Sequence, residues 1–253
     1  MSPSASIQPP ARGAVPAVCA RDDAPRRPWI AAAGWLAALG PLFFVVYGWC
    51  NVVSAGRPHV GSFFYAWERQ IPFVPWMIVP YLSIDLFFAL SFFLCRDRAQ
   101  LGVHAARITL AIVLSAAFFL LFPLRYGWPR PAVGGFLGML FAPLNAMDLP
   151  YNLCPSLHIS LRTILWRVYG RRLHGHRAWR WACAGWFLLI GLSTLLVYQH
   201  HVIDLLGGYA VGLLCCWCLP EADAVLASRQ DQTNLLPSLP CTPTTSLSPL
   251  PPA

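Results

Sequence analysis

The sequence predicts an all-α, polytopic membrane protein with six transmembrane helices. Of its 253 residues, 57% are hydrophobic and only 11% are charged, and the mean hydropathy is +0.54. Soluble globular domains carry about 25% charged residues, so this composition indicates a chain that lies largely within a membrane. Apolar runs of about 20 residues, the length that a spanning helix needs, recur along it and are separated by short polar segments.

The chain divides into one membrane domain, residues 28–219, and two polar tails. Residues 1–27 are rich in Pro, Ala, Ser and Arg, and residues 220–253 are rich in Ser, Thr, Pro and Leu. Neither tail has helical periodicity, so both are predicted to be disordered cytoplasmic segments. The first apolar run, from Trp29 to about Val53, exceeds the 7–15 residues of a signal-peptide core, and we expect it to be the first helix.

Five further helices follow, and one connection between them is unusually long. The predicted ranges are about 71–95, 105–124, 156–169, 181–199 and 201–219. Asp85 lies inside the first of these, where we expect it to pair with a Ser, Tyr or Arg side chain on a neighbouring helix. The connection 125–155 holds a Gly pair and several Pro residues. A loop of this length in a compact domain is usually functional.

The distribution of arginine predicts the orientation of these helices. The net charge is +8, and all 18 basic residues are Arg. These Arg residues lie between apolar runs, so membrane topology explains them better than nucleic-acid binding does. The first tail and the two even-numbered loops hold ten of them, and the odd-numbered loops hold four. Because basic loops stay in the cytoplasm, we expect cytoplasmic termini and odd-numbered loops facing outward, into the periplasm if the membrane is a bacterial inner membrane.

The nine cysteines do not suggest a metal site or a disulfide framework. No pair of Cys-x2-Cys motifs and no His/Cys ligand group occurs, and Cys215, Cys216 and Cys218 lie within an apolar run. We expect buried, inert thiols, because free cysteine behaves as a small hydrophobe. No cofactor is predicted.

Two polar stretches embedded in apolar sequence are the candidate catalytic residues. His158 begins the fourth predicted helix, and His200 lies four residues before Asp204. A helical i, i+4 spacing would place His200 and Asp204 on one face, where the carboxylate could orient the imidazole for attack on phosphorus. His158 would protonate the leaving oxygen. Both histidines are predicted on the outer side of the membrane.

Other polar residues near these stretches are candidate phosphate ligands. Arg130 and Arg125 of the long connection could bind phosphate oxygens in a bidentate way, and Ser156 could offer its hydroxyl or backbone N–H at a helix N-terminus. His201 is the alternative reacting histidine. Arg162 could face the pocket or extend toward the cytoplasmic surface.

These residues resemble the motifs of the type 2 phosphatidic acid phosphatase superfamily, a group of membrane lipid phosphatases and phosphotransferases. Its three motifs are Lys-x6-Arg-Pro, Pro-Ser-Gly-His and Ser-Arg-x5-His-x3-Asp. The second is similar to Pro155-Ser156-Leu157-His158. The third is similar to the stretch from Ser193 to Asp204, with Thr194 in place of Arg. The first is retained only as Arg130-Pro131, and Pro123 stands at the Lys position. The resemblance covers roughly residues 30–219, and it is nearest to the inositol phosphorylceramide synthase-like branch and to the bacterial membrane domain often fused to a dual-specificity phosphatase.

The resemblance implies a six-helix bundle and an enzyme acting on a lipid phosphate without a metal. It implies that His200 is the nucleophile, Asp204 its orienting partner and His158 the acid, with Arg130, Ser156 and Ser193 near the phosphate. The loss of two cations from the motifs favours an alternative, a catalytically degenerate scaffold or a transporter-like membrane protein. The sequence does not choose between hydrolysis and transfer, and it predicts no oligomeric state.

Overall fold

The computed structural model describes residues 28–221, whose regular structure is helical. Within this range there is no β-strand, only two isolated bridges between loops. The predicted tails lie outside the described residues, apart from residues 220–221. The α-helices are α1 (Trp29–Ala55), α2 (Ile78–Leu94), α3 (Arg98–Leu121), α4 (Gly135–Met147), α5 (Leu157–Arg172), α6 (Arg177–Leu196) and α7 (Val202–Cys218), and the 3-10 helices η1 (Ala66–Gln70) and η2 (Pro75–Met77) precede α2.

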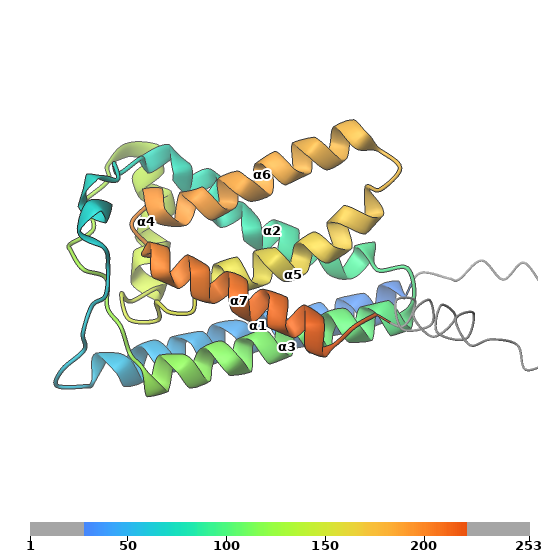
Figure 1. The fold of residues 1–253 in the computed structure, drawn as a ribbon, viewed down its shortest axis with the longest axis horizontal. Coiled ribbons are helices and arrows are strands. Elements are labelled where there is room, and N and C mark those ends of the chain that lie inside the picture. The colour runs from blue at the N-terminus through green and yellow to red at the C-terminus, as the bar shows by residue number, and fades with distance from the viewer. Residues whose placement is uncertain (1–27, 222–253) are drawn as a thin grey trace, which may run out of the picture.

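The bundle is elongated, and helices α1, α2, α3, α5, α6 and α7 run back and forth between its two ends (Figure 1). At one end, which we call the site end, lie the connecting segments 56–77, 122–156 and 197–201, together with α4. At the other, which we call the basic end, lie the short connections 95–97 and 173–176. The start of α1 and the end of α7 both lie at the basic end, as an even number of passes requires.

Four helical segments in the described part of the chain are long and apolar enough to cross a membrane. They are Trp29–Ala55, Pro75–Leu94, Arg98–Leu121 and Arg177–Leu196. The apolar helices α4 and α7 are shorter, and α5 carries four Arg residues in its 16 positions. The regular structure of the described residues is therefore all helical, and their apolar helices fit a membrane protein. Six spanning helices were predicted, and four of the described helices have the length and apolarity that spanning requires.

Helix α5 lies at the centre of the bundle, which explains how a polar helix is accommodated. It packs against α2, α3, α6 and α7, and nine of its residues are buried. Helix α1, in contrast, buries only five residues and exposes large apolar side chains such as Ile30 and Val45. A contiguous exposed apolar surface of this kind fits contact with lipid.

Small residues bring α5 and α7 into close contact. A Cβ atom at Gly208 would lie 2.3 Å from the carbonyl oxygen of Ser156, and one at Gly212 would lie 2.7 Å from Cβ of Thr163. The hydroxyl of Ser160 donates to the carbonyl of Gly208 over 2.9 Å, which crosses the same contact. Glycine is required here because the two backbones approach too closely for a side chain.

The structure differs from the prediction in two of the segments before α5. The long connection 125–155 contains α4, which begins at Gly135 with a positive φ of 64°. Asp85 is exposed on α2 and makes no hydrogen bond or ion pair with residues 28–221, so its predicted pairing is wrong. The other predicted helices agree with the observed ones to within a few residues, except that α2 begins at Ile78 and α3 at Arg98.

The basic end is held together by a buried ion pair. Arg107 of α3 is 1% exposed and lies 2.8 Å from the carboxylate of Glu221, which also pairs with Arg171 at the end of α5. Arg107 donates a second bond to the carbonyl of Leu219. These contacts attach the end of α7 to α3 and α5.

Candidate functional site

The three candidate catalytic residues lie at the site end and come from neighbouring segments. His158 is the second residue of α5, Asp204 the third residue of α7, and His200 belongs to the connection between α6 and α7. The backbone N–H of Ser156 donates to the carbonyl of Asp204 over 2.9 Å and fixes the start of α5 against the start of α7. His158 and His200 are close enough to interact electrostatically.

His200 is positioned by a tight turn rather than by a helix. Tyr198 adopts φ 57°, a left-handed conformation that is uncommon outside glycine. The carbonyl of Thr194, in the last turn of α6, accepts from the backbone N–H groups of both Gln199 and His200. Helix α7 begins only at Val202. The predicted i, i+4 placement of His200 and Asp204 on one helical face is therefore wrong, although the two side chains do meet.

The contact between His200 and Asp204 leaves polar atoms available for chemistry. Nδ1 of His200 lies 3.5 Å from Oδ2 of Asp204, and both side chains are almost fully buried. Oδ2 also accepts from the backbone N–H of His201 over 2.7 Å, whereas Oδ1 is buried without a partner in the described chain. Catalytic hydrogen bonds are often long in unliganded structures and shorten when the substrate binds, so this carboxylate can orient the imidazole.

His158 is held by Tyr81 of α2. Their rings stack with centroids 4.3 Å apart, and Nε2 of His158 lies 3.1 Å from the backbone carbonyl of Tyr81. Because a carbonyl oxygen can only accept, Nε2 carries the proton and donates it. The remaining nitrogen, Nδ1, is then the atom that can exchange a proton with a substrate.

Arg130 connects two loops of the site end. Its Nε donates to the carbonyl of Tyr198 over 3.1 Å, and its Nη1 donates to the carbonyl of Asp148 over 3.0 Å. The carboxylate of Asp148 in turn accepts from the hydroxyl of Tyr47 in α1. Nη2 makes no bond within residues 28–221, so Arg130 can position the turn before His200 and still offer a donor to an anion.

The other predicted phosphate ligands are placed less favourably for that role. Ser156 caps α5 through its hydroxyl oxygen, and its N–H is engaged by Asp204. The hydroxyl of Ser193 is buried and donates to the carbonyl of Ile190 in its own helix. Arg125 is exposed, and its side chain makes no hydrogen bond or ion pair in the described range. Arg162 donates to the carbonyl of Phe187 between α5 and α6, which is neither of its two predicted positions.

A second buried histidine cluster lies beside these residues and was not predicted from the sequence. Nδ1 of His201 lies 3.0 Å from the carboxylate of Glu68, and the two side chains are at most 1% exposed. Nε2 of His201 accepts from the backbone N–H of Gly127 over 3.1 Å. Since Nε2 accepts, the proton of the neutral ring is on Nδ1 and is donated to Glu68.

This cluster is structural, because every polar atom of the His201 ring is used. Glu68 also accepts from the backbone N–H groups of Tyr65 and Val202, so it closes the segment before α2 onto the start of α7. Tyr126 stacks on the His201 ring with centroids 4.3 Å apart. Burial lowers the pKa of His201 despite the adjacent carboxylates. His201 therefore lacks the free ring nitrogen that a nucleophile needs, whereas His200 has one.

Other reactive groups near the site do not compete with the histidines. Burial, together with the nearby Asp204, raises the pKa of the Cys154 thiol to about 11, and a protonated thiol is a poor nucleophile. Among the residues that the structure describes, no group of three or more His, Cys, Asp or Glu side chains is arranged to hold a metal ion.

Comparison of the chain with known protein families, with curated proteins and with solved structures found no match.

Proposed function

We propose that this protein is a membrane lipid phosphatase or phosphotransferase that works through a phosphohistidine on His200. The observation that supports this most directly is the difference between adjacent histidines. His201 has both ring nitrogens occupied by Glu68 and Gly127, whereas Nδ1 of His200 lies 3.5 Å from the carboxylate of Asp204 and neither nitrogen of the His200 ring makes a hydrogen bond within residues 28–221. An imidazole oriented in this way, with one free nitrogen, is an activated nucleophile.

The first step follows from these positions. Nε2 of His200 attacks phosphorus, the P–N bond forms, and the P–O bond to the leaving alcohol breaks. Asp204 stabilises the positive charge that develops on the imidazole. The electron pair of the broken bond stays on the leaving oxygen, which takes the Nδ1 proton of His158, so this ring must enter the step doubly protonated and leaves it neutral, with its proton on Nε2. The bond from Nε2 of His158 to the Tyr81 carbonyl persists throughout, so the ring keeps its orientation.

The second step returns the site to its starting state. A water molecule or a lipid hydroxyl attacks the phosphohistidine, the P–N bond breaks, and Nδ1 of His158 accepts the proton that the nucleophile loses. Water yields free phosphate, and a lipid hydroxyl yields a new phosphate ester. Charge on the transferring phosphoryl group requires preorganised donors, and Nη2 of Arg130 is a donor at the site end that makes no bond within residues 28–221.

Replacement of His158 by alanine tests the acid role. We expect the rate with an alkyl phosphate lipid to fall about 10²–10⁴-fold, the usual contribution of general acid–base catalysis. An aryl phosphate, whose leaving group needs no proton, should lose much less. The measurement is phosphate release by purified protein in detergent from a panel of lipid phosphates, with and without acceptor lipids. An equal loss for alkyl and aryl substrates would contradict the assignment.

We also propose that the site end faces away from the cytoplasm, toward the periplasm if the membrane is a bacterial inner membrane. The basic end carries most of the arginines that lie outside the apolar runs, and basic segments are retained in the cytoplasm. Reporter fusions after Leu124 and after Gly170 test this, because these residues belong to opposite ends of the bundle. The first fusion should be active outside and the second inside. The reverse pattern would overturn the orientation without affecting the chemistry.

A degenerate, non-catalytic membrane protein is the second candidate. It is favoured by the small number of cations at the site end, where Thr194 uses its hydroxyl on the carbonyl of Gly191 and Arg130 uses two of its nitrogens on backbone carbonyls. A lack of turnover with every lipid phosphate and acceptor in the panel would support it.

A further inference from the structure

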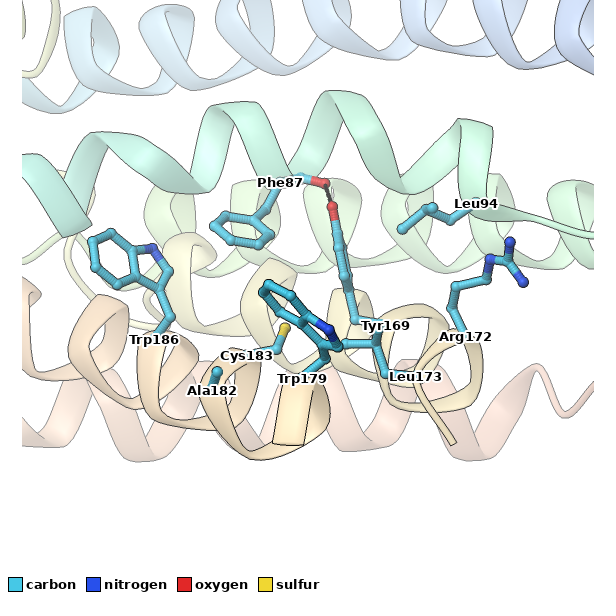
Figure 2. A pocket seen from close by; sticks show the side chains of 9 residues that line it. All are labelled: Phe87, Leu94, Tyr169, Arg172, Leu173, Trp179, Ala182, Cys183 and Trp186. Atoms are coloured by element: carbon cyan, nitrogen blue, oxygen red, sulfur yellow. Dashed lines mark hydrogen bonds between the residues drawn. The ribbon is translucent and has the colours of Figure 1, made fainter. Parts of the chain in front are cut away.

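An apolar cavity of about 410 Å³ lies between α2 and α6, toward the basic end. Figure 2 shows its lining, with Phe87 and Leu94 from α2, Tyr169 from α5, and Cys183 and Trp186 from α6. The hydroxyl of Tyr169 donates to the carbonyl of Phe87 over 3.0 Å, so this polar group of the lining already has a hydrogen-bond partner. Cavities of 300–1,000 Å³ are typical of small-ligand sites, and this one suits a hydrocarbon chain.

A second, polar cavity of about 250 Å³ adjoins the first. Leu94 and Arg172 line both, and the second is also lined by Arg96, Gln100, Val168 and Arg171. An apolar compartment thus leads directly into a basic one. This order matches the order of groups in a phospholipid, with an acyl chain followed by a phosphate.

The charges around the polar cavity favour an anion. Arg171 pairs with Glu221. Arg96 and Arg172 are exposed, and their guanidinium groups make no bond within residues 28–221. The neighbouring carboxylate of Asp97 is engaged as the N-cap of α3, where it accepts from the N–H of Gln100. Arg96 and Arg172 therefore line a space whose lining contains no carboxylate.

Aromatic residues indicate that this region lies at the membrane surface. Trp179 and Trp181, in the first turn and a half of α6, are 71% and 74% exposed. Tryptophan is enriched at the level of the lipid headgroups, and basic pockets between helices on the cytoplasmic side bind anionic headgroups. The basic end, where the two cavities adjoin, is thus at headgroup depth, and the apolar cavity extends from it between α2 and α6 toward the hydrocarbon.

We propose that these adjoining cavities bind one anionic phospholipid, with an acyl chain between α2 and α6 and the phosphate between Arg96 and Arg172. The site is at the opposite end of the bundle from His158 and His200 (Figure 1), so it is independent of the proposed phosphate-ester chemistry. The lipid fills a gap between helices that the protein itself leaves open.

Native mass spectrometry of the purified full chain in detergent tests this proposal with two probes that differ only in headgroup. These are palmitoyl-oleoyl phosphatidylglycerol and palmitoyl-oleoyl phosphatidylcholine. Each basic residue near a headgroup favours an anionic lipid appreciably. We therefore expect the first molecule of phosphatidylglycerol to bind with an affinity at least about tenfold higher than that of the first molecule of phosphatidylcholine. Arg96→Gln combined with Arg172→Gln should reduce this preference to about twofold or less. Arg177→Gln, at the same end but outside both cavities, should preserve it.

The apolar compartment is tested separately by Ala182→Trp, which fills the cavity from α6. It should lower the binding affinity for both lipids about fivefold or more, since it removes the space for the acyl chain. Leu188→Trp, at another exposed position of α6, is the matched control and should leave the affinity for both lipids unchanged. Melting temperatures verify folding, and Arg172→Gln alone replaces the double variant if that variant unfolds. The proposal would be overturned if the arginine variants kept the preference for phosphatidylglycerol or if Ala182→Trp bound both lipids as the wild type does. It would also be overturned if glycerol 3-phosphate, which has no acyl chain, displaced the bound phosphatidylglycerol.

Discussion

Replacement of His200 by alanine is expected to reduce phosphate release at least about 10³-fold, because it removes the group that forms the covalent intermediate. His200 is 5% exposed and is held by the Thr194 carbonyl through its backbone. Its side chain makes no hydrogen bond that the fold depends on, so the variant should remain folded. The loss of activity should therefore occur without a comparable change in melting temperature.

Two further measurements make this result specific. Wild-type protein that is quenched with alkali during turnover should carry phosphate in an alkali-stable linkage that acid then releases, and His200→Ala should carry none. His59→Ala, a change of the same type at an exposed position of the site end, should retain full activity. His201→Ala should instead lower the melting temperature, since it leaves the buried carboxylate of Glu68 short of a donor. Activity within tenfold of wild type in His200→Ala would exclude the phosphohistidine mechanism.

Substitution of Gly208 by alanine is expected to be among the most destabilising single changes in the bundle. The added methyl group would lie 2.3 Å from the carbonyl oxygen of Ser156 and 2.9 Å from Cβ of Ile159. Neither neighbour is the end of a flexible side chain, so α5 and α7 must separate. Overpacking of this kind costs about 1–3 kcal/mol. The separation also strains the bond from the Ser156 N–H to the Asp204 carbonyl, which should move His158 away from His200.

Thermal unfolding in detergent and phosphate release together measure this effect. Gly208→Ala should lower both the melting temperature and the activity. Gly185→Ala in α6 is the matched control, because a Cβ at that position meets no atom within 4 Å. Alanine is favoured over glycine inside a helix by roughly 0.5–1 kcal/mol, so the control should be neutral or slightly stabilising. Equal melting temperatures for the two variants would show that the contact between α5 and α7 is not tight.

The sequence predicts helices well wherever apolar runs define them. The first helix was expected from Trp29 to about Val53, and α1 spans Trp29–Ala55. Helix α4 was not predicted, because its apolar core is short and is flanked by Gly134 and Gly135, residues that usually mark turns. In the structure α4 packs against the start of α2 through its buried Phe141, a contact between distant segments that local periodicity does not encode.

The candidate site could be predicted in its members but not in its geometry. Histidine and aspartate within apolar sequence are unusual enough to be noticed. Their arrangement depends on the left-handed conformation of Tyr198, which no local sequence pattern predicts. The pairing of Glu68 with His201 joins residues 133 positions apart. A single sequence contains no signal for that contact, so Glu68 could not be assigned to the site from the sequence.

The position of α7 has a consequence for biosynthesis. Membrane helices are inserted in order from the N-terminus, and α7 is the last helix of the described chain. It follows His200 directly, carries Asp204, and completes the binding of Glu68 through the N–H of Val202. A nascent chain that has inserted only α1 to α6 would lack the paired imidazole and carboxylate. The proposed activity on membrane lipids would thus be absent until α7 has been inserted. Incompletely synthesised chains would therefore not act on the lipids of the bilayer that surrounds them.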